Sequence, residues 1–168
     1  TNRILAPIVL ETPVQSLFKS EYKVFRRDAN ALCAELSNFD LVYIDPPYNQ
    51  HPYGSNYFML NLLVNYERPE KISPVSGIPT DWNRSAYNVK KQSLSLLKDL
   101  FQKIPARFLL VSFNSEGYVS TEEIKTALEA HGQVNEEILK YNTYRASRNL
   151  RDRSIHVNEH LFLLDREG

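Results

Sequence analysis

The chain has 168 residues, 24% of them charged, and its 20 basic and 20 acidic side chains leave no formal net charge. This composition is ordinary for a globular protein, and the length suits one domain. Neutrality excludes a general electrostatic attraction to nucleic acid, so a DNA-binding surface would need a local concentration of charge. The sequence shows no apolar run near the ~20 residues of a membrane span and no secretory signal.

Residues 1–36, about the first fifth of the chain, offer few candidates for chemistry. Residues 1–21 hold short apolar pieces broken by prolines, which predicts an irregular segment without a site. Residues 22–26 predict a short strand, and Asp28 then has the position of a helix N-cap before residues 29–36. Cys33 is the single cysteine, which excludes internal disulfides and cysteine-based zinc clusters, and we expect no metal site. A reducing cytoplasm fits this composition.

Residues 41–44 are four apolar residues that predict a short strand buried on both faces, as in a parallel sheet covered by helices. Pro46 and Pro47 end this strand, because proline lacks an N–H and keeps the preceding residue out of the helical conformation. Asp45 and Pro46 are therefore held extended at the carboxyl end of the strand, where open α/β sheets bind ligands.

The residues at this strand end match the chemistry of an exocyclic amino group. The Asp45 carboxylate and the Pro46 carbonyl are two acceptors for its two N–H donors, and Tyr48 is a surface on which its ring can stack. The same four residues can also simply end a strand in a rigid turn.

The middle of the chain predicts further helices around a second strand. Residues 49–55 predict a polar loop, after which Ser55 or Asn56 caps a helix over residues 57–63. Residues 67–83 predict a long irregular loop, and residues 84–104 an amphipathic helix. Residues 107–113 predict a buried strand ending at the same sheet edge as Asp45 if the two strands are parallel.

The end of the chain completes an α/β pattern. Ser120 and Glu123 form a capping box for a helix that ends near Gly132, and residues 136–141 and 157–164 are two strand-like runs. The repeated order of strand, turn and helix predicts an α/β fold.

Asp45-Pro46-Pro47-Tyr48 resembles the signature of amino-methyltransferases that use S-adenosylmethionine, in the form found in DNA N6-adenine methyltransferases. The resemblance continues through Asn-Gln at 49–50, Tyr-Gly at 53–54 and Tyr-x-x-Leu-Asn at 57–61, which is far more specific than the tetrapeptide. It implies a Rossmann-like methyltransferase fold: the carboxyl-terminal part of a mixed sheet with helices on both faces, whose final strand runs against the rest.

The resemblance also implies roles for particular residues. Asp45, Pro46, Pro47 and Tyr48 would be catalytic. The cofactor S-adenosylmethionine would contact the Asp28 side chain, the Ala29 N–H, Asp45 and, in the turn after the second strand, Asn114. Double-stranded DNA would contact the loop after the motif and an arginine-rich segment near the end of the chain. Without the motif, this arginine-rich segment would be interpreted as a solvated hairpin loop. The predicted DNA-binding residues are Asn49, Tyr53, Tyr144, Arg145, Arg148, Arg151 and Arg153.

Part of the family's pattern is absent from these residues. A Phe-x-Gly-x-Gly turn that approaches the methionine moiety, and an acidic residue that holds the ribose, are not found. We therefore expect residues 1–168 to be the catalytic part of a single methyltransferase domain. Its first strands, cofactor-binding turn and target-recognition region would lie upstream, in a missing amino-terminal half or a second polypeptide.

The resulting hypothesis is methyl transfer from S-adenosylmethionine to N6 of a flipped adenine in DNA, in a bacterial restriction-modification context. One alternative is the same chemistry on cytosine N4, an RNA base or a protein amide. The other is a non-catalytic DNA-binding remnant or partner subunit of a split methyltransferase. The recognition sequence and the oligomeric state do not follow from these residues.

Overall fold

The computed structural model describes residues 11–15, 18–81, 84–142 and 156–168. Its helices are α1 (Ala29–Cys33), α2 (Tyr53–Asn56), α3 (Phe58–Asn65), α4 (Lys90–Lys103) and α5 (Thr121–Glu129), with one 3-10 turn, η1 (Ala86–Asn88). Its strands are β1 (Phe39–Ile44), β2 (Ala106–Asn114), β3 (Gln133–Asn142) and β4 (His156–Asp165). None of the helices in these ranges has the length and apolar character needed to cross a membrane.

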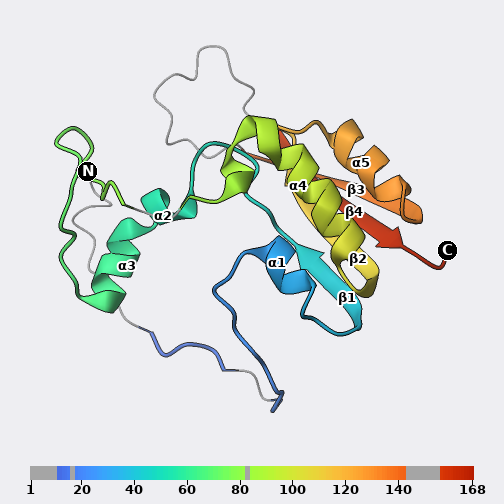
Figure 1. Cartoon of the computed structure of the whole chain (residues 1–168), viewed down its shortest axis with the longest axis horizontal. Coiled ribbons are helices and arrows are strands. Elements are labelled where there is room, and N and C mark those ends of the chain that lie inside the picture. The colour runs from blue at the N-terminus through green and yellow to red at the C-terminus, as the bar shows by residue number, and fades with distance from the viewer. Residues whose placement is uncertain (1–10, 16–17, 82–83, 143–155) are drawn as a thin grey trace.

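The four strands form one mixed sheet in the order β1-β2-β4-β3 (Figure 1). β1 and β2 are parallel, with Val42 opposite Leu109, whereas β4 is antiparallel to both of its neighbours, with Phe162 opposite Val111. The prediction of an α/β sheet whose final strand runs against the others is confirmed. Because β1 and β2 are parallel, their carboxyl ends, with Asp45 and Asn114, lie at the same edge of the sheet.

The core lies on one face of this sheet. In the register of β2 and β4, Leu109 lies opposite Leu164 and Val111 lies opposite Phe162. Because alternate residues of a strand point to the same side of the sheet, these four side chains share one face, and all four are fully buried. They form one hydrophobic cluster with apolar side chains of α4 and α5, namely Leu97, Leu100, Phe101, Ile124 and Leu128. Figure 1 shows α1, α4 and α5 on this side of the sheet.

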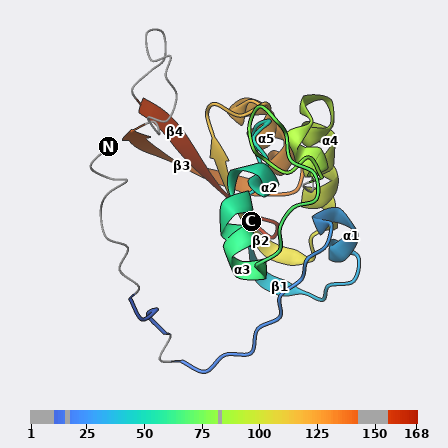
Figure 2. The ribbon, with the colours of Figure 1, turned by 90° about the vertical axis from the view of Figure 1, so that its left-hand side faces the viewer.

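Part of the opposite face of the sheet is apolar and open in the part of the chain that the structure describes. Leu41 and Tyr43 of β1 are 51% and 57% exposed there, and Phe39 and Leu163 are also exposed. The expectation of helices on both faces is therefore met on one face, and the prediction that residues 41–44 are buried on both sides is wrong here. α3 does not cover the open face, because it packs against α2 and lies beyond the end of the sheet (Figures 1 and 2).

Two local predictions are also corrected. Residues 22–26 form no strand, and Tyr22 and Val24 are each 86% exposed, because this segment has no strand beside it to complete its backbone hydrogen bonds. The helix expected over residues 57–63 is present as α3, but its N-cap is Tyr57 and not Ser55 or Asn56, because residues 53–56 form the separate short helix α2 with Pro52 as its N-cap. The Ser55 hydroxyl donates to the Pro52 carbonyl at 3.0 Å, so it stabilises the first turn from inside the helix.

Several helix ends follow the sequence signals. The Asp28 carboxylate accepts a hydrogen bond from the Ala31 N–H at 2.9 Å, and Ser120 and Glu123 form both bonds of a capping box. Between α5 and β3 the backbone passes so close to Asp165 that only glycine fits at position 132, because a Cβ there would lie 2.2 Å from the Asp165 carbonyl oxygen. The connection therefore passes directly against the end of β4.

Candidate functional site at the carboxyl edge of the sheet

The four residues of the strand-end motif lie immediately after β1. Asp45 is exposed, Pro46 is buried, and Pro47 and Tyr48 are half-buried. Within the described ranges, no residue donates a hydrogen bond to the Asp45 carboxylate or to the Pro46 carbonyl. Two acceptors with unused capacity therefore lie side by side, as the chemistry of an amino-group site requires.

Tyr48 is held by the turn that follows β2. The backbone N–H of Tyr118 donates to the Tyr48 carbonyl at 2.8 Å, and the Tyr118 hydroxyl donates to the Gln50 side chain at 2.8 Å. The Tyr48 ring meets the Phe113 ring edge to face, with centroids 6.4 Å apart and an interplanar angle of 70°. The aromatic ring of the motif is thus fixed by backbone and ring contacts from the neighbouring strand.

Negative charge gathers around this edge. Desolvation, followed by the nearby Glu159 carboxylate, raises the pKa of Asp45 above its usual value. Desolvation also raises the pKa of the Tyr48 hydroxyl, with further contributions from Glu159, Glu116 and Asp45. Desolvation likewise raises the pKa of the Tyr53 hydroxyl, with Asp45 as the next cause.

A hollow of about 870 Å³ runs beside β1 and brings together residues that are far apart in the sequence. Asp28 and Ala29 line it from α1, Asp45 and Pro46 line it from the motif, and Tyr87 lines it from η1. Asp28 uses one carboxylate oxygen for its cap, and Ala29 stands at the first helical position, where a backbone N–H has no partner within the helix. An acceptor next to a donor, with apolar walls, fits the edge of an adenine ring.

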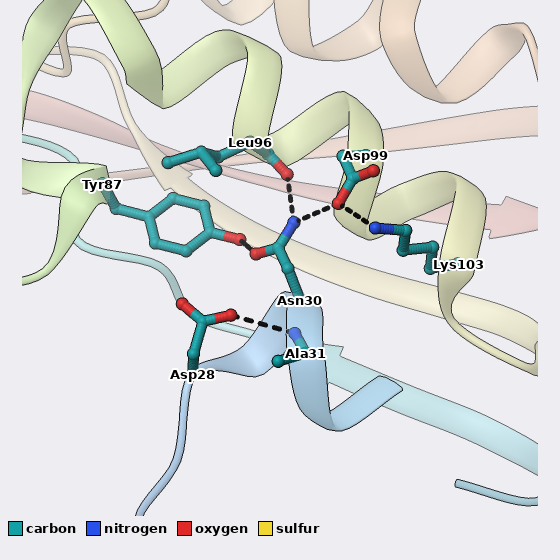
Figure 3. A network of polar contacts seen from close by, with 7 residues as sticks. All are labelled: Asp28, Asn30, Ala31, Tyr87, Leu96, Asp99 and Lys103. Atoms are coloured by element: carbon teal, nitrogen blue, oxygen red, sulfur yellow. Dashed lines mark hydrogen bonds and ion pairs between the residues drawn. The ribbon is translucent and has the colours of Figure 1, made fainter. Parts of the chain in front are cut away.

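The α1 end of this hollow is fixed by a buried polar network (Figure 3). The Asn30 amide nitrogen donates to the Leu96 carbonyl at 2.9 Å and to the Asp99 carboxylate at 2.8 Å, both on α4. The Tyr87 hydroxyl donates to the Asn30 side-chain oxygen, and Lys103 pairs with Asp99 at 2.8 Å. Asn30 therefore docks the short helix α1 onto α4 and η1, and with it the neighbouring Asp28 and Ala29.

Two other predicted site residues, Asn114 and Asn49, make hydrogen bonds within the protein. Asn114 does not line the hollow: its side-chain oxygen accepts from the Glu116 N–H at 2.9 Å and its nitrogen donates to Glu159 at 3.3 Å. The Asn49 side chain accepts from the His51 N–H at 2.9 Å, and its carbonyl accepts from Asn88 at 2.7 Å.

Of the other predicted DNA contacts, Tyr53 lies within the described residues. The Tyr53 ring is 52% exposed and stacks on Tyr57, with centroids 5.7 Å apart. Five of the predicted DNA-binding residues lie outside the described residues: Tyr144, Arg145, Arg148, Arg151 and Arg153. The assignments of all these residues to cofactor or DNA stay predictions.

Sequence reasoning missed Asn30, Tyr118 and Glu159. Asn30 reads as one polar residue in an ordinary helix, and nothing in the sequence indicates its partners on α4. Glu159 left a signal, because a carboxylate next to the apolar run 161–164 of a central strand requires polar partners when it is buried.

The fold and this edge of the sheet are those of the amino-methyltransferase class: a mixed α/β sheet with Asp-Pro-Pro-Tyr at the carboxyl end of a parallel strand. The chain belongs to the family of D12 class N6 adenine-specific DNA methyltransferases, whose family model matches residues 6–126.

Three curated relatives illustrate the similarity. The type II methyltransferase M.FokI of Planomicrobium okeanokoites is 37% identical over 110 residues, which are 66% of this chain and 17% of the relative. The type II methyltransferase M.NlaIII of Neisseria lactamica is 26% identical over 166 residues, 96% of this chain and 48% of the relative. The modification methylase StsI of Streptococcus sanguinis is 32% identical over 152 residues, 86% of this chain and 22% of the relative. The chain thus spans less than half the length of each.

Proposed function

We propose that this protein transfers a methyl group from S-adenosylmethionine to N6 of adenine in double-stranded DNA. The observation that carries the proposal is the pair of unoccupied acceptors, the Asp45 carboxylate and the Pro46 carbonyl, next to the anchored ring of Tyr48. The family supports the adenine substrate, and the relatives named as modification methylases support a restriction-modification context in a bacterial cytoplasm.

The residues of the edge can bind and orient the target base. Adenine must leave the duplex, because its amino nitrogen is unreachable while it is stacked and paired. Tyr48 stacks on the extruded ring, and Asp45 and Pro46 each accept one N–H of the amino group. These two bonds aim the nitrogen lone pair away from the protein and toward the methyl donor, so catalysis comes from positioning and preorganised charge.

S-adenosylmethionine, when bound, supplies an electrophilic methyl group. Asp28 and Ala29 would hold its adenine at one end of the hollow, and Asp45 at the other end would face its amino group. The open face of β1, with Leu41 and Tyr43 exposed, would be covered by the polypeptide that completes the cofactor site. We propose that this polypeptide is the rest of a longer protein or a second chain. Mass spectrometry of the natural protein would detect it as a mass well above 19.5 kDa or as a second species.

Replacement of Asp45 tests the function. Asp45→Ala in the complete protein should lower the transfer of radiolabelled methyl groups to DNA by roughly 100- to 1,000-fold, because one of the two oriented acceptors is lost. Asp40→Ala, which removes an exposed carboxylate from the other end of β1, is the matched control and should stay near wild type.

The products decide between the alternatives. Digestion of the methylated DNA to nucleosides should yield N6-methyladenine, whereas N4-methylcytosine would move the assignment to the other amino acceptor. Unchanged activity in Asp45→Ala, or methylation of neither base by the complete protein, would overturn the proposal in favour of a non-catalytic role.

A further inference from the structure

Four polar side chains share the open face of the sheet at its carboxyl edge. Ile44, the last residue of β1, lies opposite Val111. If the alternation of the strand continues through Asp45, its side chain lies on the same face as that of Ser112. Ser112 lies opposite Leu161 and Asn114 lies opposite Glu159, which places those two polar residues and Glu159 on that face as well. Residues from three strands therefore meet where β1 and β2 end.

Glu159 is firmly oriented within this group. The Ser112 hydroxyl donates to one oxygen of its carboxylate, and the Asn114 amide donates to the other at 3.3 Å. Both donors are buried, with 7% and 4% of their surfaces exposed, and Asn114 is itself fixed by the N–H of Glu116. A carboxylate held by two buried donors keeps one position relative to the strands that carry it.

We propose that Glu159 is a positioning residue of the proposed methyltransferase site, holding a second carboxylate beside Asp45 so that both act on the amino nitrogen that becomes positive. The inference rests on the proposed function. In that reaction the nitrogen lone pair forms the new N–C bond while the C–S bond breaks with its electrons remaining on sulfur. The nitrogen then releases one proton, which Asp45 accepts and passes to solvent.

The carboxylates of Asp45 and Glu159 act in both the methyl transfer and the proton release. Their combined negative charge stabilises the positive charge that develops on the nitrogen, and this effect exists only as the methyl group moves. Glu159 also strengthens Asp45 as a proton acceptor, in line with the upward direction of its pKa, to which Glu159 contributes after desolvation. Among the described residues, the hydroxyls of Tyr48 and Tyr53 also interact electrostatically with Asp45. The hollow that Asp45 lines carries further titratable or charged groups, namely Arg26, Arg27, Asp28, Cys33, Tyr43, Arg84 and Tyr87.

A titration of Asp45 tests the inference without requiring methyl transfer. The carbon-13 signal of the Asp45 carboxyl, assigned by its loss in Asp45→Asn, would be followed against pH by NMR. Glu159→Gln should move the midpoint down by about 0.5 pH units or more, because a neighbouring like charge is removed. Glu116→Gln is the matched control, since Glu116 acts on Tyr48 and is not among the groups that shift Asp45, and it should leave the midpoint in place.

Methylation by the complete protein supplies a second measurement. Asp45 must be ionised to accept an N–H, so Glu159→Gln should shift the acid limb of kcat to lower pH by the same amount and lower kcat about tenfold. In Glu159→Asp, which keeps the charge, the Asp45 midpoint should lie at least halfway back from its value in Glu159→Gln to its wild-type value. A role in folding alone predicts no selective change of the Asp45 midpoint.

The outcomes separate this inference from the proposed function. An inactive Asp45→Asn together with an unchanged Asp45 midpoint in Glu159→Gln would overturn the role of Glu159 and leave the function standing. If Glu159→Gln fails to fold, salt decides the question in the wild-type protein. Raising the ionic strength should lower the Asp45 midpoint by screening Glu159, and a midpoint that does not fall with salt would refute the inference.

Discussion

The buried asparagine of α1 offers a direct test of how the cofactor end of the site is held. Asn30 is 8% exposed and makes hydrogen bonds to Tyr87, Leu96 and Asp99 (Figure 3). Asn30→Ala removes all three and leaves the buried Tyr87 hydroxyl without its acceptor. An unsatisfied buried hydroxyl costs about 1–3 kcal/mol, and a lost hydrogen bond costs about 1 kcal/mol.

The change in helix propensity acts in the opposite direction. Alanine favours the helix over asparagine by roughly 0.5 kcal/mol, which offsets part of the loss. We therefore expect Asn30→Ala to lower the free energy of unfolding by about 2–3 kcal/mol, a large share of the ~5–15 kcal/mol typical of a domain. Tyr87→Phe, which removes only the hydroxyl, should cost about 1 kcal/mol.

Urea unfolding followed by far-ultraviolet circular dichroism would measure these differences. Gln102→Ala is the matched control, because it removes an exposed amide from α4 and should change the free energy of unfolding by less than about 0.5 kcal/mol. If Asn30→Ala is no more destabilising than Gln102→Ala, the network does not dock α1, and the account of how Asp28 and Ala29 are positioned fails.

Three further perturbations test other parts of the structure. Ser120→Ala should lower the free energy of unfolding by about 1 kcal/mol through loss of the α5 capping box, measurable by the same urea titration. Gly117→Ala should lower the rate of methyl transfer at saturating substrate, because its Cβ would lie 2.5 Å from the Phe113 ring that supports Tyr48; an unchanged rate in steady-state kinetics would contradict this. The pKa of Glu136 is lowered first by its hydrogen bond to His160 at 2.7 Å, so its contribution to stability is present above the usual glutamate pKa and is lost as pH falls through the lowered value. Glu136→Gln should therefore flatten the acid side of the stability–pH curve, and a curve that matches wild type would refute the assignment.

The motif and the main elements of the sheet could be predicted from the sequence, because they depend on local rules. Pro46 and Pro47 cannot continue a strand, so Asp45 had to stand at its end whatever the rest of the chain does. The apolar runs of β2 and β4 and the capping signals of Asp28 and Ser120 are likewise local. The resemblance of Asp45-Pro46-Pro47-Tyr48 and of its extension through residues 49–61 to the family's signature indicated the family, and the match over residues 6–126 confirms it.

Burial and partnership could not be predicted in the same way, because they depend on what other segments cover. Residues 41–44 are as apolar as a strand enclosed on both sides, yet Leu41 and Tyr43 are exposed because the described residues place helices on one face only. Residues 22–26 have strand-forming composition but no neighbouring strand to bond with.

By itself, the sequence determined the chemistry at the end of β1: two acceptors and an aromatic ring held in order by two prolines. The tertiary structure alone decided which distant groups act on them. The parallel pairing of β1 with β2 and the antiparallel pairing of β2 with β4 bring Glu159 to the same end of the sheet as Asp45, although 113 residues lie between them in the sequence. Strand pairing is set by the burial of whole faces, so such a meeting of charges has no local signal in the chain.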